Sequence, residues 1–178
     1  MQSNFTPRSQ EILSLAQQLA QKFKNSEVTL DHLLLSFLKV DSFLVPYLEG
    51  KLDCSFIEVE GLVLDSITYI KKTNTEHENV PFGSDVKDCL SVCSQISSDR
   101  DHSYISVEHI LYAMITTLDF SVIDYFIICN IDVEKMQSTI EEVLSHDIIY
   151  NPALMSYYDQ PEAQNQNSAS SKPVESYS

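Results

Sequence analysis

Basic side chains are scarce in this sequence of 178 residues, which has 11 Lys and Arg against 26 Asp and Glu and a formal net charge of −15. Such a surface repels phosphate groups, so direct binding to nucleic acid or to an anionic membrane is unfavourable. Long apolar runs are missing too, because a run such as 121–131 is far shorter than the roughly 20 residues that cross a bilayer. The first residues, MQSNFTPRSQ, lack the basic-then-apolar order of a signal peptide. We therefore expect a soluble, cytoplasmic protein that binds neither nucleic acid nor membrane.

Glycine is also scarce, with three residues, and no G-x-x-x-x-G-K-[ST] segment is present. Backbone N–H groups approach a nucleotide phosphate closely only where glycines permit it, so we expect no ATP hydrolysis. No nucleophile is accompanied by a base and an oxyanion-binding group in a credible pattern. Paired acids such as Glu58/Glu60 and Glu141/Glu142 are typical of solvated helix surfaces. These absences predict a protein that is not an enzyme and needs no cofactor.

The cysteines also lack a pattern that would give them a special role. All four lie among apolar residues, where a reduced thiol packs as a small core side chain. A disulfide framework is typical of small secreted domains instead. Zinc binding by Cys89 and Cys93 with the later His102 and His109 is disfavoured, because the spacing is not that of a zinc finger. We expect no metal site and four reduced packing residues, Cys54, Cys89, Cys93 and Cys129.

Apolar residues at helical spacing, in contrast, run along most of the chain. After Thr6, a natural N-cap, and Pro7, one apolar stripe extends from Ile12 to Phe23. Further helices are predicted to start at Thr29, at Asp53 or Ser55, near Ser84, at Ser106 and at Asp132. A short segment is expected at 43–48, ending at Gly50, and a short helix at 122–129. The helix that opens at Asp53 or Ser55 carries the apolar residues Phe56, Ile57, Val63, Leu64 and Ile67.

The second half of the chain repeats the first at an offset of 77 positions. Equivalent pairs are Phe5/Phe82, Leu13/Leu90, Asp31/Glu108, His32/His109 and Leu34/Leu111. A two-residue insertion then aligns 52–54 with 131–133. Each unit is expected to contain four helices. We predict an all-α fold in which repeat one (5–72) and repeat two (82–146) pack as one pseudo-symmetric domain over residues 1–150.

Two segments lack the helical stripe. Residues 73–81 are polar and charged, and we expect them to form an exposed linker. From Asn151 onward Ser, Gln, Asn and Pro dominate, so burial of apolar surface cannot offset the entropy lost on ordering. We therefore predict a flexible tail over 151–178. The alternative is that part of this tail docks as a short segment through Leu154, Met155, Tyr157 and Tyr158.

The double pattern resembles the N-terminal domain of the Clp AAA+ unfoldases, known as the Clp R or Clp-N domain. The resemblance is carried by FTPRSQEILSLAQQLA at 5–20, VTLDHLLLSFL at 28–38 and HSYISVEHILYAMI at 102–115, and it covers roughly 5–144. It implies a non-catalytic domain that receives substrates and adaptor proteins and passes them to an ATPase ring. Because the phosphate-binding loop is missing, the chain looks like a free-standing Clp-N domain.

In some members of this family the domain binds phosphorylated arginine, and the resemblance implies which residues correspond here. Asp31 and Glu108 match the acids that hold the guanidinium, and Thr6 matches the hydroxyl that holds the phosphate. In the second repeat Gly83 replaces that threonine, while Lys87 matches a basic position. The chemistry is sound, because carboxylates pair with guanidinium and helix N-termini accept phosphate.

A structural interpretation of the same residues stands beside this one. Asp31 and Glu108 lie in the first turns of their helices, where an acid stabilises the helix dipole without any ligand. His32 and His109 are equivalent in the two repeats, so we expect them to form structural hydrogen bonds between helices rather than to act as metal ligands or bases.

Three functional hypotheses follow. The first is an adaptor, decoy or accessory subunit of a Clp protease system, whose partner is a Clp ATPase, a Clp adaptor, the protease core or a substrate degron. It suits a bacterial or phage-infected cytoplasm better than a plastid, because no transit-type leader precedes the repeats. The second is an acidic protein that mimics DNA and inhibits a basic DNA-binding protein. The third is the N-terminal fragment of a longer Clp ATPase.

Overall fold

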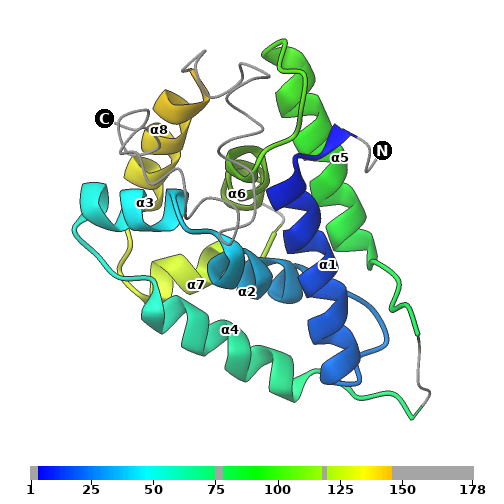
Figure 1. The fold of residues 1–178 in the computed structure, drawn as a ribbon. Helices are drawn as coiled ribbons and strands as arrows, with labels where there is room; N and C mark the ends of the chain where they lie inside the picture. The colour runs from blue at the N-terminus through cyan, green and yellow to red at the C-terminus, as the bar shows by residue number, and fades with distance from the viewer. Residues whose placement is uncertain (1–3, 75–77, 118–119, 146–178) are drawn as a thin grey trace, which may run out of the picture.

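The computed structural model describes residues 4–74, 78–117 and 120–145, which form eight helices joined by short loops (Figure 1). The helices are α1 (Pro7–Lys22), α2 (Leu30–Val40), α3 (Leu44–Leu52), α4 (Ile57–Tyr69), α5 (Ser84–Asp99), α6 (Val107–Thr116), α7 (Ile123–Ile128) and α8 (Val133–Leu144). Within these ranges no helix has the length and apolar character needed to cross a membrane. The fold is all-α, as the periodicity predicts.

Most helices begin where the sequence places a cap. The Oγ1 atom of Thr6 accepts a hydrogen bond from the N–H of Ser9 at 3.2 Å, at the start of α1. Thr29 and Ser106 each form a capping box with the histidine three residues later. Asp132 caps α8 with its carboxylate. These side chains satisfy N–H groups that a helix start would otherwise leave without a partner.

The two repeats, α1–α4 and α5–α8, share the same backbone turns. Left-handed φ angles occur at two equivalent pairs, Lys24 (56°) with Asp101 (56°), and Asp53 (50°) with Asn130 (58°). Both pairs keep the offset of 77 positions, so the pseudo-symmetry predicted from the sequence is present in the backbone.

The turns after α3 and α7 correct one detail of the predicted alignment. The N–H of Cys54 donates to the carbonyl of Glu49, and the N–H of Ile131 donates to the carbonyl of Phe126. These bonds are again 77 positions apart, so the expected two-residue insertion before 52–54 is wrong.

Helices α2 and α6 lie at the centre of the molecule (Figure 1). Helices α1 and α4 pack on α2, α5 and α8 pack on α6, and the two central helices contact each other. Their fully buried side chains form the middle of the core: Leu33, Leu34, Leu35 and Phe37 of α2, and Ile110, Leu111 and Met114 of α6. The first helix and the last helix of each repeat therefore cover a central apolar helix.

Two boundaries differ from the sequence prediction. Helix α3 continues past the exposed Gly50 to Leu52 and ends at Asp53, whose left-handed conformation stops it. Helix α4 begins at Ile57 rather than at Asp53 or Ser55, with Phe56 as its N-cap. The sequence misplaces both ends because neither boundary is marked by the residue type that usually forms it.

The apolar residues of α4 divide between the core and the surface. Its buried face consists of Val59, Val63 and Ile67, which recur every four residues. Two residues that the sequence places among its apolar set, Ile57 and Leu64, are exposed, and Ile57 is 73% exposed. Helix α4 therefore carries more apolar side chains than its contact with α2 needs.

The predicted linker and tail lie partly outside the described residues. This applies to 75–77 of the linker and to all of 151–178, including the segment with Leu154, Met155, Tyr157 and Tyr158. Within the linker, Val80 is buried, and its carbonyl accepts a hydrogen bond from Gln17 Nε2 at 3.1 Å. The N–H of Thr73 donates to the carbonyl of Lys24 at 2.8 Å. Both described ends of the linker are thus held against α1 and the turn that follows it.

Candidate functional site

The helix starts of the two repeats meet in two equivalent places. We name the first junction one: it joins the start of α1 to the start of α6. The N–H of Thr6 donates to the carbonyl of Ile105 at 3.0 Å, and the N–H of Ile105 donates to the carbonyl of Asn4 at 2.8 Å. These bonds make a short parallel bridge between repeat one and repeat two.

Junction two is the equivalent contact between the starts of α5 and α2. The N–H of Gly83 donates to the carbonyl of Val28, and the N–H of Val28 donates to the carbonyl of Pro81, both at 2.8 Å. Each junction therefore joins the first helix of one repeat to the second helix of the other.

The four site residues predicted from the sequence are distributed between these junctions. Thr6 lies at junction one, which also contains the start of the helix that carries Glu108. Lys87 lies one turn into α5 at junction two, where α2 begins with Asp31 in its first turn. Each junction thus joins the start of the helix that carries the hydroxyl or basic group of one repeat to the start of the helix that carries the acid of the other repeat.

At junction one both predicted residues are buried. Thr6 caps its own helix and donates from Oγ1 to Ser9 Oγ at 2.9 Å. Glu108 is buried and its charge acts on Asp41, whose pKa is raised to about 7. Burial is the largest cause of this rise, the hydrogen bond from the N–H of Val45 opposes it, the charge of Glu108 adds to it and the charge of Arg8 opposes it. Glu108 is therefore part of an internal group of charges.

At junction two a carboxylate of the chain lies where a phosphate would be expected. Asp85 accepts hydrogen bonds from the N–H of Leu30 at 3.0 Å and from the N–H of Val86 at 2.7 Å. These N–H groups belong to the starts of α2 and α5, the positions that would otherwise attract an anion. The equivalent position in repeat one is Arg8. The two junctions thus have the same backbone and opposite charges at this position.

Close approach of the backbone explains the glycine at junction two. A Cβ atom at Gly83 would lie 3.0 Å from the carbonyl oxygen of Val28 and 3.0 Å from Cδ of Glu27. A threonine, which the family resemblance would place there, would require its neighbours to shift by a few tenths of an ångström. Lys87, one turn later, is exposed.

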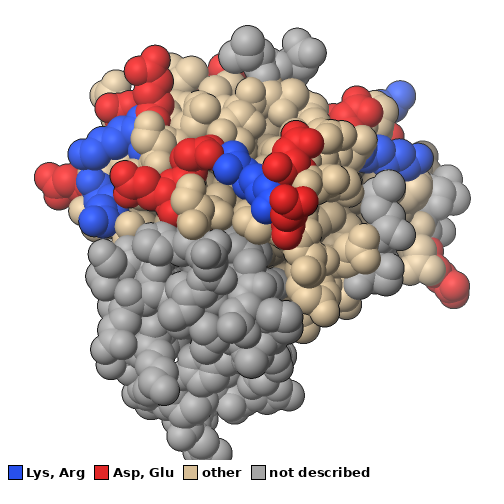
Figure 2. Space-filling view, turned by 90° about the horizontal axis from the view of Figure 1, so that it is seen from above, with Lys and Arg blue, Asp and Glu red and all other residues tan. Residues whose placement is uncertain are grey.

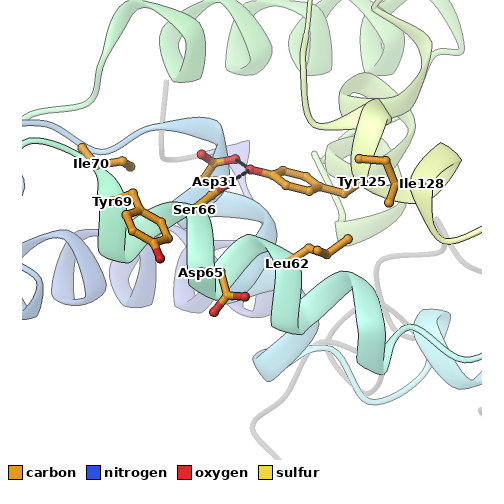
Figure 3. A pocket seen from close by; sticks show the side chains of 8 residues that line it. All are labelled: Asp31, Leu62, Asp65, Ser66, Tyr69, Ile70, Tyr125 and Ile128. Carbon is orange, nitrogen blue, oxygen red and sulfur yellow. Dashed lines mark hydrogen bonds between the residues drawn. The ribbon is translucent and has the colours of Figure 1, made fainter.

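The carboxylate of Asp31 lines a groove beside α4 and α7 and points toward Tyr125 (Figure 3). Its Oδ1 atom lies 2.8 Å from the hydroxyl of Tyr125, and that hydroxyl lies 2.7 Å from Ser66 Oγ. Because a phenol has one proton, Tyr125 donates to the carboxylate and accepts from Ser66. Burial raises the pKa of Asp31, the bond from Tyr125 lowers it, and the charge of Asp85 raises it.

This groove, which we name the α4–α7 groove, is open to solvent and has a volume of about 500 Å³. Asp31 of α2 and Ile70, which follows α4, line part of it (Figure 3). Helix α4 contributes Leu62, Asp65, Ser66 and Tyr69, and helix α7 contributes Tyr125 and Ile128. Apart from Asp31, sequence reasoning missed all of them. The available signal was the surplus of apolar residues in α4, together with the adjacent Ile127 and Ile128 on a helix of six residues.

The two equivalent histidines are structural. The Nδ1 atoms of His32 and His109 accept from the N–H of Thr29 and Ser106, each at 2.9 Å. Burial lowers the pKa of His32 to about 4 and that of His109 to about 3. Both rings are therefore neutral at neutral pH and engaged in capping. The hydrogen bonds are within the helix start and to the preceding loop, rather than between helices.

All four cysteines are free thiols, as the sequence predicts. Cys89 and Cys93 are buried in the core, while Cys54 and Cys129 are half-buried and pack against it. Among the residues that the structure describes, no group of three or more His, Cys, Asp or Glu side chains is arranged to hold a metal ion.

Comparison with solved structures supports the fold described above. The N-terminal domain of Hsp104 from Candida albicans matches with a TM-score of 0.71 at 20% identity, over 80% of this chain and 92% of that one. The N-terminal domain of the chaperone ClpD from Arabidopsis thaliana matches with a TM-score of 0.64 at 19% identity, over 82% and 100%. A ClpV N-domain in complex with a VipB peptide matches with a TM-score of 0.59 at 20% identity, over 80% and 88%.

The family comparison agrees with these structures. Residues 4–127 match the Clp repeat (R) N-terminal domain family, and this range contains both junctions and all but one residue of the α4–α7 groove. Because this match spans the double repeat and its paired helix starts, the chain belongs to the Clp repeat N-terminal domain family.

Proposed function

We propose that the chain is a non-catalytic protein-interaction module that regulates or feeds a Clp protease system in the cytoplasm of a bacterial or phage-infected cell. It acts as an adaptor, as a decoy that occupies adaptors, or as an accessory subunit. The observation that carries the proposal is the position of Asp31: an acid that the family resemblance implicates in binding has its carboxylate in an open groove. Its partner is a Clp ATPase, a Clp adaptor, the protease core or a substrate degron.

The related ClpV N-domain supports a peptide as the unit of recognition, because that domain forms a complex with a VipB peptide. For this chain we propose Asp31 and Lys87 as direct contacts, since both are accessible to some degree. Thr6 and Glu108 are buried, so they contribute by fixing junction one. A phosphorylated arginine at junction two is opposed by Asp85, whose carboxylate accepts from the helix-start N–H groups.

The alternative, an acidic mimic of DNA, has less support on the face that Figure 2 shows. There Lys and Arg side chains lie between the acidic ones, so the acidic surface is interrupted (Figure 2). Two cations of the described residues pair with acids: Lys39 Nζ lies 3.2 Å from Glu60, and Arg100 Nη1 lies 2.7 Å from Glu141. A phosphate mimic needs uninterrupted carboxylates instead.

The test is affinity capture from bacterial lysate with the tagged full chain, read by mass spectrometry. We compare the wild type with Asp31→Ala/Lys87→Ala and with a control, Glu134→Ala/Lys135→Ala, which removes one exposed acid and one exposed base from α8. We expect a Clp ATPase, adaptor or protease core with the wild type and the control, and at least a fivefold loss with Asp31→Ala/Lys87→Ala. Recovery of DNA-binding proteins from all three, lost at moderate salt, would instead support DNA mimicry.

A further inference from the structure

We propose that the α4–α7 groove docks an extended protein segment in which a basic side chain lies between apolar ones, with the basic group paired to Asp31. This inference rests on the proposed function in two respects: it takes the occupant to be a protein segment, and it uses the carboxylate of Asp31 in the same groove. It concerns the helical face formed by α4 and α7, rather than the two junctions.

The apolar part of the argument comes from exposure. Of the six large apolar side chains that are exposed in the described residues, five belong to α4 or α7. Tyr69 is 88% exposed and Ile128 is 66% exposed, and both line the groove. The sixth, Tyr104, lies in the loop before α6. The exposed apolar side chains are therefore concentrated on the two helices that form the walls of the groove, and two of them lie in the groove itself. Exposed apolar surface of this kind is typical of a site that a partner covers.

The charge inside the groove indicates a basic occupant. Asp31 and Asp65 are the charged residues among the eight that line it, and no Lys or Arg is among them. The nearby Asp85 adds a further negative charge beside Asp31. Lys72, which follows the groove residue Ile70 closely in the chain, instead donates from Nζ to the carbonyl of Phe23 at 2.8 Å. A cationic side chain would therefore meet a partly buried carboxylate with no competing cation in the lining.

The walls of the groove are fixed before anything binds. The rings of Phe56 and Phe126 meet edge to face, with centroids 5.6 Å apart, and hold the start of α4 against α7. The bonds from Tyr125 to Asp31 and with Ser66 join α7 to α2 and α4. A preformed groove loses little conformational entropy on binding, which favours recognition of a flexible segment.

Charge complementarity also distinguishes between the possible occupants. A second copy docking face to face would place Asp31 and Asp65 of both copies together, and each chain has a net charge of −15. The chain's own residues 151–178 contain three acids and one lysine, so they do not complement the groove either. A segment of another protein with both basic and apolar side chains would complement the acidic charge of the groove and bury its exposed apolar surface.

The experiment measures fluorescence anisotropy of a short labelled peptide in which one arginine is flanked by leucines, titrated with the full chain. The matched peptide has citrulline, which is neutral and of the same shape, in place of arginine. We expect the arginine peptide to bind at least tenfold more tightly than the citrulline peptide. Tyr69→Ala should weaken the arginine peptide at least fivefold, while the control Tyr104→Ala should leave it unchanged. Asp31→Asn should make the two peptides equivalent.

Equal binding of the arginine and citrulline peptides, or equal effects of Tyr69→Ala and Tyr104→Ala, would overturn the inference. A concentration-dependent dimer that Tyr69→Ala dissociates would assign the groove to a second copy, and nuclear Overhauser contacts between Tyr69 and residues 151–178 would assign it to the tail.

Failure of the proposed function can be distinguished from failure of this inference. If only the proposed function fails, the arginine peptide binds as expected, but no Clp component is captured from lysate. Conversely, capture that is unaffected by Tyr69→Ala with no peptide binding would overturn the groove alone.

Discussion

The hydroxyl of Tyr125 donates a hydrogen bond to the carboxylate of Asp31 over 2.8 Å, although the two residues are 94 positions apart in the chain. The bond joins the short helix α7 of repeat two to the central helix α2 of repeat one. Repeat two has no counterpart, because the positions equivalent to Asp31 and Tyr125 hold Glu108 and Leu48, both of which are buried. The pseudo-symmetric fold therefore presents this carboxylate on one side only.

We expect Tyr125→Phe to lower the free energy of unfolding by about 1 kcal/mol, because a hydrogen bond to a partly buried carboxylate is lost. The bond from Tyr125 lowers the pKa of Asp31, so the same change should raise that pKa further above its ordinary value. Urea denaturation and carboxyl NMR titration measure the two effects. Tyr69→Phe is the control, since Tyr69 is largely exposed; a pKa of Asp31 that does not move in Tyr125→Phe would contradict the assigned role.

The stability of the fold should decrease on acidification. Burial lowers the pKa of His32 to about 4 and that of His109 to about 3, whereas both would titrate near 6.5 in the unfolded chain. The unfolded state thus binds more protons below about pH 6.5, and the stabilising contribution is lost as pH falls from there toward 4 and 3. Asp41, whose pKa burial raises to about 7, acts in the opposite direction, because its contribution is lost as pH rises through 7.

We therefore expect a net loss of roughly 2 kcal/mol in the free energy of unfolding between about pH 7.5 and about pH 4.5. Denaturant titrations at the two pH values measure it. Asp41→Asn removes the opposing contribution and should make the loss larger; a smaller loss in that variant would show that the sign is wrong.

One of the two histidine caps should be more sensitive to acid than the other. Since His109 Nδ1 accepts from Ser106, its Nε2 carries the proton and faces His102 Nδ1 at 2.9 Å. The equivalent His32 Nε2 faces Asn25 Oδ1 at 2.8 Å, an acceptor that takes up no proton near neutral pH. A proton on His102 Nδ1 would abolish the bond to His109.

Hydrogen exchange at about pH 5 should accordingly be faster for the first amides of α6 than for those of α2. His102→Asn should remove most of that difference, because it gives repeat two the partner that repeat one has. Asn25→His is the reciprocal variant and should transfer the acid sensitivity to α2. If His102→Asn leaves exchange in α6 unchanged, the pair does not control this helix start.

Junction two predicts opposite effects for two glycine substitutions. A Cβ atom at Gly83 would lie 3.0 Å from the carbonyl oxygen of Val28, so Gly83→Ala should destabilise the protein by about 1–3 kcal/mol. Gly61 lies in α4 with nothing within 4 Å of its ideal Cβ position, so Gly61→Ala should stabilise it by about 0.5–1 kcal/mol. Thermal or urea unfolding of both variants measures the difference, and equal effects would exclude close backbone approach as the reason for glycine at this position.

Asp85 should decide how junction two responds to phosphoarginine. In the wild type its carboxylate accepts from the N–H groups of Leu30 and Val86, so added phosphoarginine should leave those two amide signals unshifted in NMR spectra. Asp85→Ser removes the negative charge, and the same amides should then shift on addition. Shifts of both amides in the wild type would show that phosphate displaces Asp85.

Much of the fold could be predicted from the sequence because local signals agree with the packing. Caps such as Thr6, Ser106 and Asp132 mark helix starts by their own hydrogen bonds, and the offset of 77 positions reveals the repeat directly. Boundaries that depend on backbone conformation were harder to predict, as the left-handed Asp53 after α3 shows. Glycine at position 50 suggested an ending there, but that residue is an ordinary exposed position of the helix.

The candidate site was predictable only in part, since it depends on contacts between distant segments. The sequence identified Asp31 by its place in the first turn of its helix, but not Tyr125, which reaches it from the other repeat. Apolar periodicity did not separate the exposed Ile57 and Leu64 from the buried Val63, because both sets are simply apolar. The packing of α7 beside α4, which the sequence does not reveal, decides which apolar residues of α4 stay exposed to solvent.

The crossed bridges at the two junctions bear on how such a chain arose. A single repeat has no partner for the bonds that Thr6 makes with Ile105, or that Gly83 makes with Val28. Two separate copies of one ancestral unit would form both bridges between molecules, as a two-fold symmetric homodimer does. Gene duplication and fusion make the same contacts intramolecular and no longer dependent on concentration. Once joined, the halves no longer had to be identical, and Arg8 opposite Asp85 and Leu48 opposite Tyr125 record their divergence.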